Sequence, residues 1–265
     1  MSDSGSITAD DGCRIAWRAD GPRDARVLLL SNSLGTDMDM WSEQVDVFAG
    51  QFRVLRYDAR GHGASGTTPG DYSLDRLGRD ALALLDALGI DRIDFCGVSL
   101  GGMIGQWLAW RAPERLRRIV LSNTSAFMGP PAGWQTRIDA VRRDGMAGIA
   151  DATLARWLTA RFVALRPDVA TALVATLKAT DPQGYAGCCA AIRDMDLRPT
   201  ARLVTTPALV IGGSEDPATP PGHAIALADH LQGAILLMLP AAHLANIEAP
   251  DAFNEAVLDF LGNTR

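Results

Sequence analysis

Short segments that are apolar at most positions recur along the chain, and they limit its fold more than any other feature. Several of them lack the alternation of a half-exposed strand, which is typical of strands in a parallel sheet covered on both faces. We therefore expect a mostly parallel sheet with helices on both sides. The predicted strands are CRIAWRA (13–19), RVLLLSN (26–32), FRVLRYD (52–58), RIDFCGV (92–98), RRIVLSN (117–123), PALVIGG (207–213) and AILLMLP (234–240).

Helical periodicity separates several of these predicted strands. Apolar residues recur at intervals of three and four, and each stretch ends at a glycine or near a proline. The order strand, helix, strand, helix predicts a doubly wound α/β fold. The predicted helices are LDRLGRDALALLDALG (74–89), GGMIGQWLAWRAPERL (101–116) and APDAFNEAVLDFLG (249–262).

The stretch 127–206 shows no convincing strand pattern but contains helical segments such as DATLARWLTARFVAL. It is too long for an ordinary crossover between two strands. We predict a helical cap at 127–206, opened by the Gly/Pro-rich GPPAGW and closed near RPTARLVTTP. The cap would be inserted into one core formed by 1–126 and 207–265.

Composition excludes several classes of function. The net charge of −6 comes without a basic block, so we expect no nucleic-acid partner. No stretch of about 20 residues is apolar enough to span a bilayer, and MSDSGSITADDG lacks the pattern of a signal peptide. We therefore expect a cytoplasmic protein without membrane association. The cysteines are too few and too irregularly spaced for a disulfide framework or paired metal ligands: Cys13, Cys96, Cys188 and Cys189.

One serine, Ser99, lies between two glycines where a predicted strand meets a predicted helix. Gly97-Val98-Ser99-Leu100-Gly101 fits the G-x-S-x-G pattern of a nucleophile on a sharp strand-to-helix turn. Side chains two residues to either side would collide with the neighbouring strand and helix, which explains the glycines. The alternatives are a turn with a capping serine or a phosphate-binding loop, although neither GxGxxG nor GxxxxGK[ST] occurs here.

A serine nucleophile requires a base, and the chain has four histidines. His62 precedes the serine in a glycine-rich loop, and His223 and His230 fall on a predicted helix. His243 directly follows the last predicted strand, and catalytic groups of an open α/β sheet gather at the carboxyl ends of its strands. We predict that His243 is the base.

The acid that orients this histidine is predicted in the loop after the strand PALVIGG. That loop contains Glu215 and Asp216. We choose Asp216, with Glu215 as the alternative, because serine, acid and histidine then follow one another along the chain in the order expected for this motif. Another position that supplies the acid in some enzymes carries Ser122 and Asn123, and neither has a carboxylate.

Backbone amides are expected to stabilise the oxyanion that forms when the serine attacks. The amide after the nucleophile belongs to Leu100, and the helix that begins there directs its free N–H groups at the site. The second donor is expected in the loop after the strand 26–32, where we select the amide of Leu34. Asn32 and Ser33 stand where many such enzymes have His-Gly, which changes how this loop is braced but leaves the amides in place.

Together these motifs resemble the α/β-hydrolase superfamily, and the resemblance covers essentially the full chain. Within it, the chain is similar to the 3-oxoadipate enol-lactonases of the β-ketoadipate pathway. The segments that carry this similarity are SNSLGTDMDMW (31–41), YDARGHGASG (57–66), CGVSLGGMIGQWLA (96–109) and HLANIEAPDAFNEAVLDFL (243–261). The resemblance implies hydrolysis of 3-oxoadipate enol-lactone, a small anionic lactone, to 3-oxoadipate, without metal or cofactor, during bacterial breakdown of aromatic compounds.

The implied substrate carries a carboxylate, which requires a cation or a group of donors. The candidates are Arg137, Arg161, Lys178 and Arg193, of which we select the first two as predicted contacts. Trp134 is the predicted apolar wall over the lactone ring, with Met128 and Met195 as weaker candidates. The expected assembly is a monomer or a small homo-oligomer.

Other functions share the same three residues. The alternatives within enzymes are a general carboxylesterase, a cofactor-free perhydrolase of the haloperoxidase type and a carbon–carbon bond hydrolase. A non-enzyme alternative is a receptor-like ligand-binding module of the same fold.

Overall fold

The computed structural model describes residues 2–262, and its sheet has the strand order β1-β2-β4-β3-β5-β6-β7-β8. β1 and β2 pair antiparallel, as do β2 and β4, and all other neighbours pair parallel. The predicted doubly wound, mostly parallel sheet is confirmed. The strands are β1 (Asp3–Thr8), β2 (Arg14–Asp20), β3 (Val27–Ser31), β4 (Arg53–Tyr57), β5 (Ile93–Val98), β6 (Leu116–Ser122), β7 (Ala208–Gly213) and β8 (Ile235–Leu239). Residue 1 and residues 263–265, at the ends of the predicted core ranges, lie outside the described residues.

The two edge strands differ from what their sequences predict. β1 has the polar sequence DSGSIT and is mostly exposed, so it carries no apolar signal. β8 is apolar throughout, but because it lies at the other edge of the sheet, Ile235 and Leu236 are 56% and 38% exposed. The predicted helix 101–116 was also too long, since Leu116 already begins β6.

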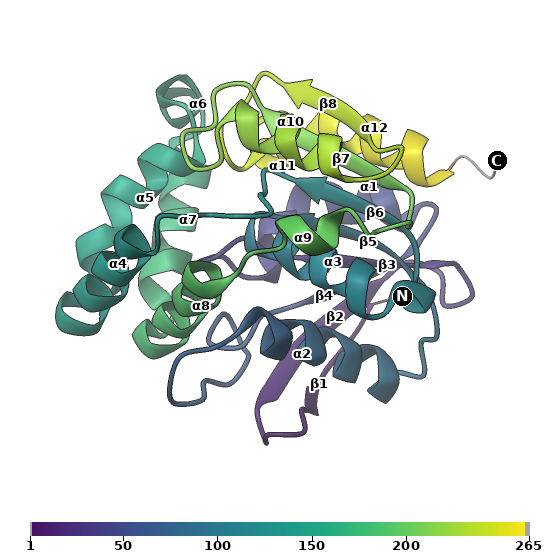
Figure 1. The fold of residues 1–265 in the computed structure, drawn as a ribbon, viewed down its shortest axis with the longest axis horizontal. Helices are drawn as coiled ribbons and strands as arrows, with labels where there is room; N and C mark the ends of the chain where they lie inside the picture. The colour runs from purple at the N-terminus through teal and green to yellow at the C-terminus, as the bar shows by residue number, and fades with distance from the viewer. Residues whose placement is uncertain (1, 263–265) are drawn as a thin grey trace.

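Helices cover both faces of the sheet (Figure 1). Helices α1, α11 and α12 contact one another on one face, while α2, α3, α9 and α10 form a second contacting group on the other. Their bounds are α1 (Ser42–Ala49), α2 (Leu74–Ala87), α3 (Leu100–Arg111), α9 (Arg198–Ala201), α10 (Pro221–His230), α11 (Ala245–Glu248) and α12 (Pro250–Gly262), with short 3-10 turns η1 (Met38–Trp41), η2 (Pro113–Arg115) and η3 (Met146–Ile149).

A helical insertion separates β6 from β7. Its helices α4 to α8 stand to one side of the sheet, in teal to green in Figure 1. Their bounds are α4 (Pro131–Asp144), α5 (Ala150–Trp157), α6 (Ala160–Leu165), α7 (Pro167–Ala179) and α8 (Pro182–Asp194). The insertion sits close to the core at one point in particular, because a Cβ at Gly61 would lie 2.2 Å from the Cα of Gly184 in α8.

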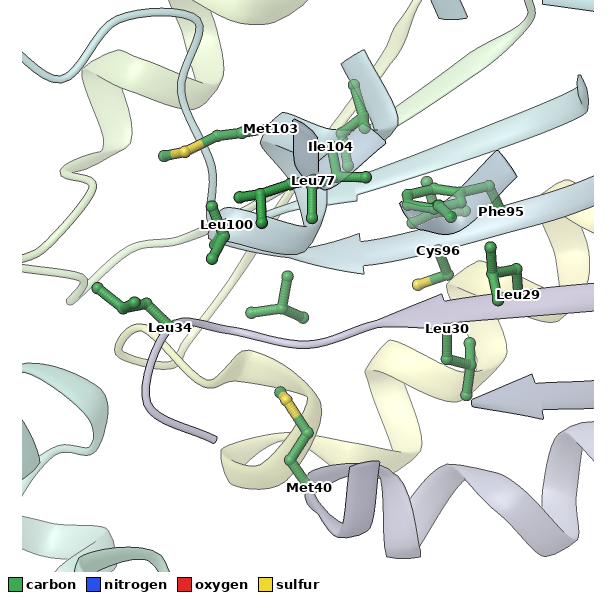
Figure 2. Packing of buried hydrophobic residues seen from close by; sticks show 14 of the residues in the cluster. Leu29, Leu30, Leu34, Met40, Leu77, Phe95, Cys96, Leu100, Met103 and Ile104 are labelled. Carbon is green, nitrogen blue, oxygen red and sulfur yellow. The ribbon is translucent and has the colours of Figure 1, made fainter. Parts of the chain in front are cut away.

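The sheet and the helices enclose one continuous apolar core. Figure 2 shows part of it, with Leu29 and Leu30 of β3, Phe95 of β5, and Ile104 of α3 packed together. Each of these side chains is almost fully buried, and burying a side chain of this size contributes about 1.5–3 kcal/mol. Since these strands come from one parallel layer, the loops at their carboxyl ends are held at one edge of the sheet.

Candidate active site

Ser99 occupies a strained turn between β5 and α3. Its φ of 57° and ψ of −114° are unusual for a residue other than glycine. A Cβ at Gly97 would lie 2.4 Å from the carbonyl carbon of Gly101, and a Cβ at Gly101 would lie 2.1 Å from the carbonyl oxygen of Ser31. The expectation that the flanking glycines avoid collisions with the strand and helix is confirmed.

His243 and Asp216 form a buried pair in the loops that follow β8 and β7. The distance between His243 Nδ1 and Asp216 Oδ2 is 2.8 Å, and each residue is 3% exposed. This bond leaves Nε2 as the ring nitrogen that is not occupied by Asp216. The structure therefore brings together the acid and the base that the sequence predicts.

Asp216 is held by further hydrogen bonds on both of its oxygens. Oδ1 accepts from the backbone amides of Ala218 and Thr219 at 2.7 and 2.9 Å, and Oδ2 accepts from the Thr219 hydroxyl at 2.7 Å. Burial by itself would raise the pKa of Asp216, but the hydrogen bonds from His243, Asn123 and Thr219 outweigh it and hold the pKa below its usual value. Asp216 is therefore kept as a carboxylate.

Asn123 supports this carboxylate, which the sequence did not predict. Its Nδ2 donates to Asp216 Oδ2 at 3.0 Å and to the Ala242 carbonyl at 3.1 Å. Its Oδ1 accepts from the Ser122 hydroxyl at 2.7 Å. From the sequence, Asn123 was considered only as a possible acid. The signal that could have indicated its role is its side-chain amide, which is able to donate a hydrogen bond to a nearby carboxylate.

Glu215, the alternative acid, faces another direction. Its side chain is 49% exposed and its Oε1 lies 3.6 Å from Arg161 Nη2. Asp216 is the member of this pair that contacts His243.

Two backbone amides near Ser99 have no acceptor among residues 2–262, and they belong to Leu34 and Leu100. The Leu100 amide is the first of α3, where no intrahelical acceptor exists. Three neighbouring amides are bonded within the protein: Ser33 N–H donates to Met40 Sδ, Gly35 N–H to His62 Nε2 and Gly101 N–H to the Asn32 carbonyl. Both predicted oxyanion donors are thus free of protein acceptors among the described residues.

The Asn32 side chain braces the loop that carries Leu34. Its Nδ2 donates to the Tyr57 carbonyl at 2.9 Å, and its Oδ1 accepts from Trp41 Nε1 at 2.8 Å. These bonds tie the loop to β4 and η1. Where many such enzymes have His-Gly, this loop therefore has a buried asparagine, Asn32, whose side-chain nitrogen and oxygen are both hydrogen-bonded.

His62 braces the same loop from the other side. Its Nε2 accepts the Gly35 amide proton at 2.9 Å, which requires a neutral ring, and Nδ1 lies 3.2 Å from the Arg60 carbonyl. Burial lowers the pKa of His62 from its usual 6.5 to about 4, although the Arg60 carbonyl acts in the opposite direction. Protonation of His62 would break its bond with the loop.

We expect His62 to make the folded protein less stable as the pH falls. Between pH 6.5 and 4 the unfolded chain binds a proton at His62 and the folded chain does not, so the stability present above pH 6.5 is lost as the pH falls. The loss is about 3 kcal/mol on going from pH 7 to pH 4. Chemical denaturation of wild type and His62→Gln at both pH values measures it. Because Asp58, with a pKa of about 6, acts in the opposite direction, the relevant quantity is the difference between the two proteins. An equal change in both would contradict the prediction.

A cavity lies between the sheet edge and the helical insertion. Ser99, His243 and Leu34 all line it, so the structure brings the predicted nucleophile, base and oxyanion loop to one space. Among the hydrogen bonds of residues 2–262, none joins Ser99 Oγ to His243, and such bonds often form only when substrate is bound. The remaining lining residues are Ser33, Met103, Met128, Trp134, Arg137, Thr153, Arg156, Trp157, Tyr185, Ile192, Ala218 and Thr219.

Two arginines line this cavity without an acidic partner in the described part of the chain. Arg137, which was predicted, is 3.4 Å from the Thr153 hydroxyl and lies over the Trp134 ring at 5.7 Å from its centroid. Arg156, which was not predicted, comes from α5 and has no ion pair within residues 2–262. Its sequence signal was weak, because one more arginine on a cap helix is usually a solvated surface charge. Trp134 also lines the cavity, and its Nε1 donates to the Met128 carbonyl at 2.9 Å.

Arg161 does not line the cavity, contrary to its prediction as a substrate contact. Its side chain is 65% exposed and its guanidinium lies 3.6 Å from Glu215 and 4.0 Å from Glu248. The physical reason is that α6, which carries Arg161, lies beside two acidic residues, Glu215 in the loop after β7 and Glu248 at the end of α11. Lys178, Arg193 and Met195 are also absent from the cavity lining, while Met128 is part of it.

Within residues 2–262, no three or more His, Cys, Asp or Glu side chains come together in a way that could hold a metal ion. None of the helices in the same range is both long and apolar enough to span a bilayer.

The fold and this arrangement at the sheet edge define a class of protein. The model of the α/β-hydrolase fold family matches residues 26–250, and the chain belongs to that family. It is a hydrolase of this fold that resembles enol-lactonases. The resemblance predicted from the sequence is confirmed.

Individual relatives agree with this assignment over nearly their full length. The chain is 40% identical over 252 residues to 3-oxoadipate enol-lactonase 2 of Acinetobacter baylyi, which covers 95% of this chain and 94% of that protein. The structure of the enol-lactonase from Burkholderia xenovorans LB400 is 43% identical, with a TM-score of 0.96 over 98% of this chain and 100% of that one. A hydrolase structure from Pseudomonas aeruginosa is 46% identical, with a TM-score of 0.96 over 98% and 99% of the two chains.

Proposed function

We propose that the protein hydrolyses 3-oxoadipate enol-lactone to 3-oxoadipate, with Ser99, His243 and Asp216 as a catalytic triad. The observation that carries the proposal is the shared cavity. Ser99 and the Asp216-bound His243 line it together with two arginines that have no acidic partner among the described residues. A hydrolytic centre and free cations in one space suit an ester that carries a negative charge. The names of the enol-lactonase relatives support the same substrate.

In the first step Ser99 Oγ adds to the lactone carbonyl while His243 Nε2 accepts its proton. Asp216 holds Nδ1–H, so the ring keeps the correct tautomer and the imidazolium is stabilised. The developing oxyanion accepts hydrogen bonds from the amides of Leu34 and Leu100. Removing one such donor costs about 3 kcal/mol of transition-state stabilisation in comparable sites.

The second step breaks the bond between the ring oxygen and the acyl carbon. The ring oxygen leaves as an enolate, and the proton held by His243 neutralises it. The leaving group stays attached to the acyl-enzyme and is able to reclose the ring until the enol becomes a ketone. His243 then takes a proton from water, the hydroxide adds to the acyl carbon, and Ser99 leaves with that proton.

Arg137 and Arg156 are the proposed partners of the substrate carboxylate, and Trp134 is the proposed wall against the ring. Both arginines are free to turn a planar pair of donors toward an anion, because neither has an acidic partner within residues 2–262. In this proposal the core comprises 1–126 and 207–265, and the cap at 127–206 supplies recognition. The reaction takes place in the cytoplasm during aromatic breakdown and requires no cofactor.

Removing either cation is expected to weaken binding of the anionic lactone. Arg137→Gln and Arg156→Gln should each raise KM about 10- to 100-fold, since a hydrogen bond to a charged group is worth about 1.5–3 kcal/mol. Hydrolysis of p-nitrophenyl acetate, which has no carboxylate, should change less than about threefold. Arg161→Gln is the matched control outside the cavity, with both activities within about twofold of wild type. Equal losses for both substrates would contradict the proposed role.

The test of the function is the decrease in ultraviolet absorbance of freshly prepared 3-oxoadipate enol-lactone, with p-nitrophenyl acetate for comparison. We expect kcat/KM of at least about 10⁵ M⁻¹s⁻¹ for the lactone, well above the ester. Turnover of the nitrophenyl ester alone would support the triad and contradict the substrate. Binding without turnover of either compound would favour a ligand-binding module.

A further inference from the structure

The hydroxyl of Tyr185 has no protein partner, although the residue is almost completely buried. Tyr185 belongs to α8, is 1% exposed, and lines the same cavity as Ser99 and His243. Its hydroxyl makes no hydrogen bond to any of residues 2–262, yet it is not one of the polar atoms that the protein encloses completely. The small surface that Tyr185 keeps therefore includes its hydroxyl oxygen.

The chain has three tyrosines, and the hydroxyls of the other two are bonded within the protein. Tyr57 Oη lies 2.9 Å from Ser31 Oγ, and Tyr72 Oη–H donates to the Thr68 carbonyl at 2.8 Å. Neither of these tyrosines lines the cavity. Since a buried tyrosine usually has a hydrogen-bond partner, the Tyr185 hydroxyl is the one left for a molecule in the cavity.

The Tyr185 ring is held in place by contacts with the core. Gly184, the residue before it, packs so closely on Gly61 that a Cβ on either glycine would lie 2.2 Å from the Cα of the other. The ring lies against the loop after β3, because a Cβ at Gly35 would be 3.1 Å from Tyr185 Cε2. The His62 ring is 6.4 Å away, centroid to centroid. A donor fixed in this way loses little freedom when a ligand binds.

Two positive charges of the cavity act on the Tyr185 hydroxyl. Burial raises the pKa of Tyr185 well above its ordinary value, and Arg137 and Arg156 both act in the opposite direction. Such an effect falls off with distance, so the three groups lie near one another in the cavity that they all line. Arginine has donors only and is unable to accept the hydroxyl proton, whereas a carboxylate accepts on both oxygens. These three side chains therefore form a group of donors that suits a carboxylate.

We propose that Tyr185 Oη–H donates a hydrogen bond to the substrate carboxylate, beside Arg137 and Arg156, an inference that rests on the proposed function. Tyr185 keeps its proton throughout, and no covalent bond to it forms or breaks. A hydrogen bond to an anion is shorter and stronger than one to a neutral group. Because the carboxylate takes no part in the chemistry, the bond is equally strong before and during attack, and it acts on KM more than on kcat. Tyr185 thus selects anionic lactones over neutral ones.

The test is Tyr185→Phe, which removes only the hydroxyl oxygen. We expect KM for the enol-lactone to rise about 10-fold, with kcat within about threefold of wild type. α-Angelica lactone is the matched neutral substrate, since it has the same ring with a methyl group in place of the carboxymethyl group. Its kcat/KM, and that of p-nitrophenyl acetate, should change less than about threefold. Tm should stay the same or rise, because no hydrogen bond within the protein is lost.

Tyr72→Phe is the matched control variant. Its hydroxyl donates to the Thr68 carbonyl and accepts from the Thr68 amide, at 2.8 and 3.1 Å, outside the cavity lining. We expect a lower Tm, with kinetics within about twofold of wild type for both lactones. Equal losses of kcat/KM for the two lactones in Tyr185→Phe would overturn the inference, since they would place the hydroxyl at the ring. A fall in kcat at unchanged KM, or unchanged kinetics, would overturn it as well.

Inhibition by the product separates the failure of this inference from the failure of the proposed function. The product 3-oxoadipate should inhibit p-nitrophenyl acetate hydrolysis competitively, with Ki about 10-fold higher in Tyr185→Phe than in wild type. If wild type does not open the lactone but Ki rises in the variant, the proposed function fails and the contact with the carboxylate stands. If wild type opens the lactone and neither KM nor Ki changes, the function stands and the inference fails. If wild type neither opens the lactone nor is inhibited, both fail.

Discussion

Replacing Ser99 with alanine is expected to lower kcat for the enol-lactone by about 10⁶-fold, the loss seen when a triad nucleophile is removed. Alanine cannot form the acyl-enzyme, so only the oxyanion amides and substrate positioning remain to accelerate attack by water. Binding of the lactone should persist, because the arginines and Trp134 are unchanged. Steady-state absorbance assays measure the loss, and isothermal titration measures the retained binding.

Ser125→Ala is the control for this substitution. Ser125 is also buried, but its hydroxyl donates to the Phe127 carbonyl at 2.7 Å and it does not line the cavity. Its kcat should stay within about threefold of wild type. A Ser99→Ala protein that retained more than about 1% of wild-type kcat, after contamination had been excluded, would show that another group attacks the lactone.

Replacing Asp216 with asparagine is expected to lower kcat by about 10⁴-fold. Asparagine cannot supply the negative charge that stabilises the imidazolium, and its NH₂ group would favour the wrong tautomer of His243. The NH₂ group of the asparagine would also lie against other hydrogen-bond donors, because Asn123, Thr219 and the Ala218 amide all donate to this carboxylate in the wild type. We therefore expect a lower free energy of unfolding as well, measured by chemical denaturation beside the kinetics.

Glu215→Gln tests whether the effect belongs to this carboxylate. Glu215 is the neighbouring residue, but it is half exposed and lies beside Arg161 instead of His243. Its kcat is expected to remain within about twofold of wild type. If Glu215→Gln lost more activity than Asp216→Asn, the assignment of the acid would be reversed.

Strand prediction succeeded for the apolar segments, including the edge strand β8, and missed the polar edge strand β1. Segments such as RVLLLSN and RIDFCGV are buried on both faces, so their composition alone indicates a strand. β1 was missed because an edge strand with exposed faces needs no apolar residues. The exposure of Ile235 in β8 was equally unforeseen, since the apolar composition of a strand does not say whether a neighbour covers its far edge.

The site residues also divide into those that the sequence alone could identify and those that it could not. The residues of the proposed triad could be selected from the sequence because each has a required chemistry and a required place after a strand. Arg156 and Arg161 are alike in sequence, on neighbouring cap helices, yet one lines the cavity and the other is exposed beside Glu215. Only the packing of α5 and α6 against the core separates them.

The amino-acid order alone was sufficient to identify the parallel sheet, the inserted helices, and the order of Ser99, Asp216 and His243. Apolar periodicity and strand-end motifs are local properties, so they can be recognised in the amino-acid sequence without the folded structure. The partner of Arg161 and the support of Asp216 by Asn123 became visible only in the folded structure. Each of these depends on contacts between segments far apart in the chain, and such contacts are set by how the cap and the strand-end loops pack together.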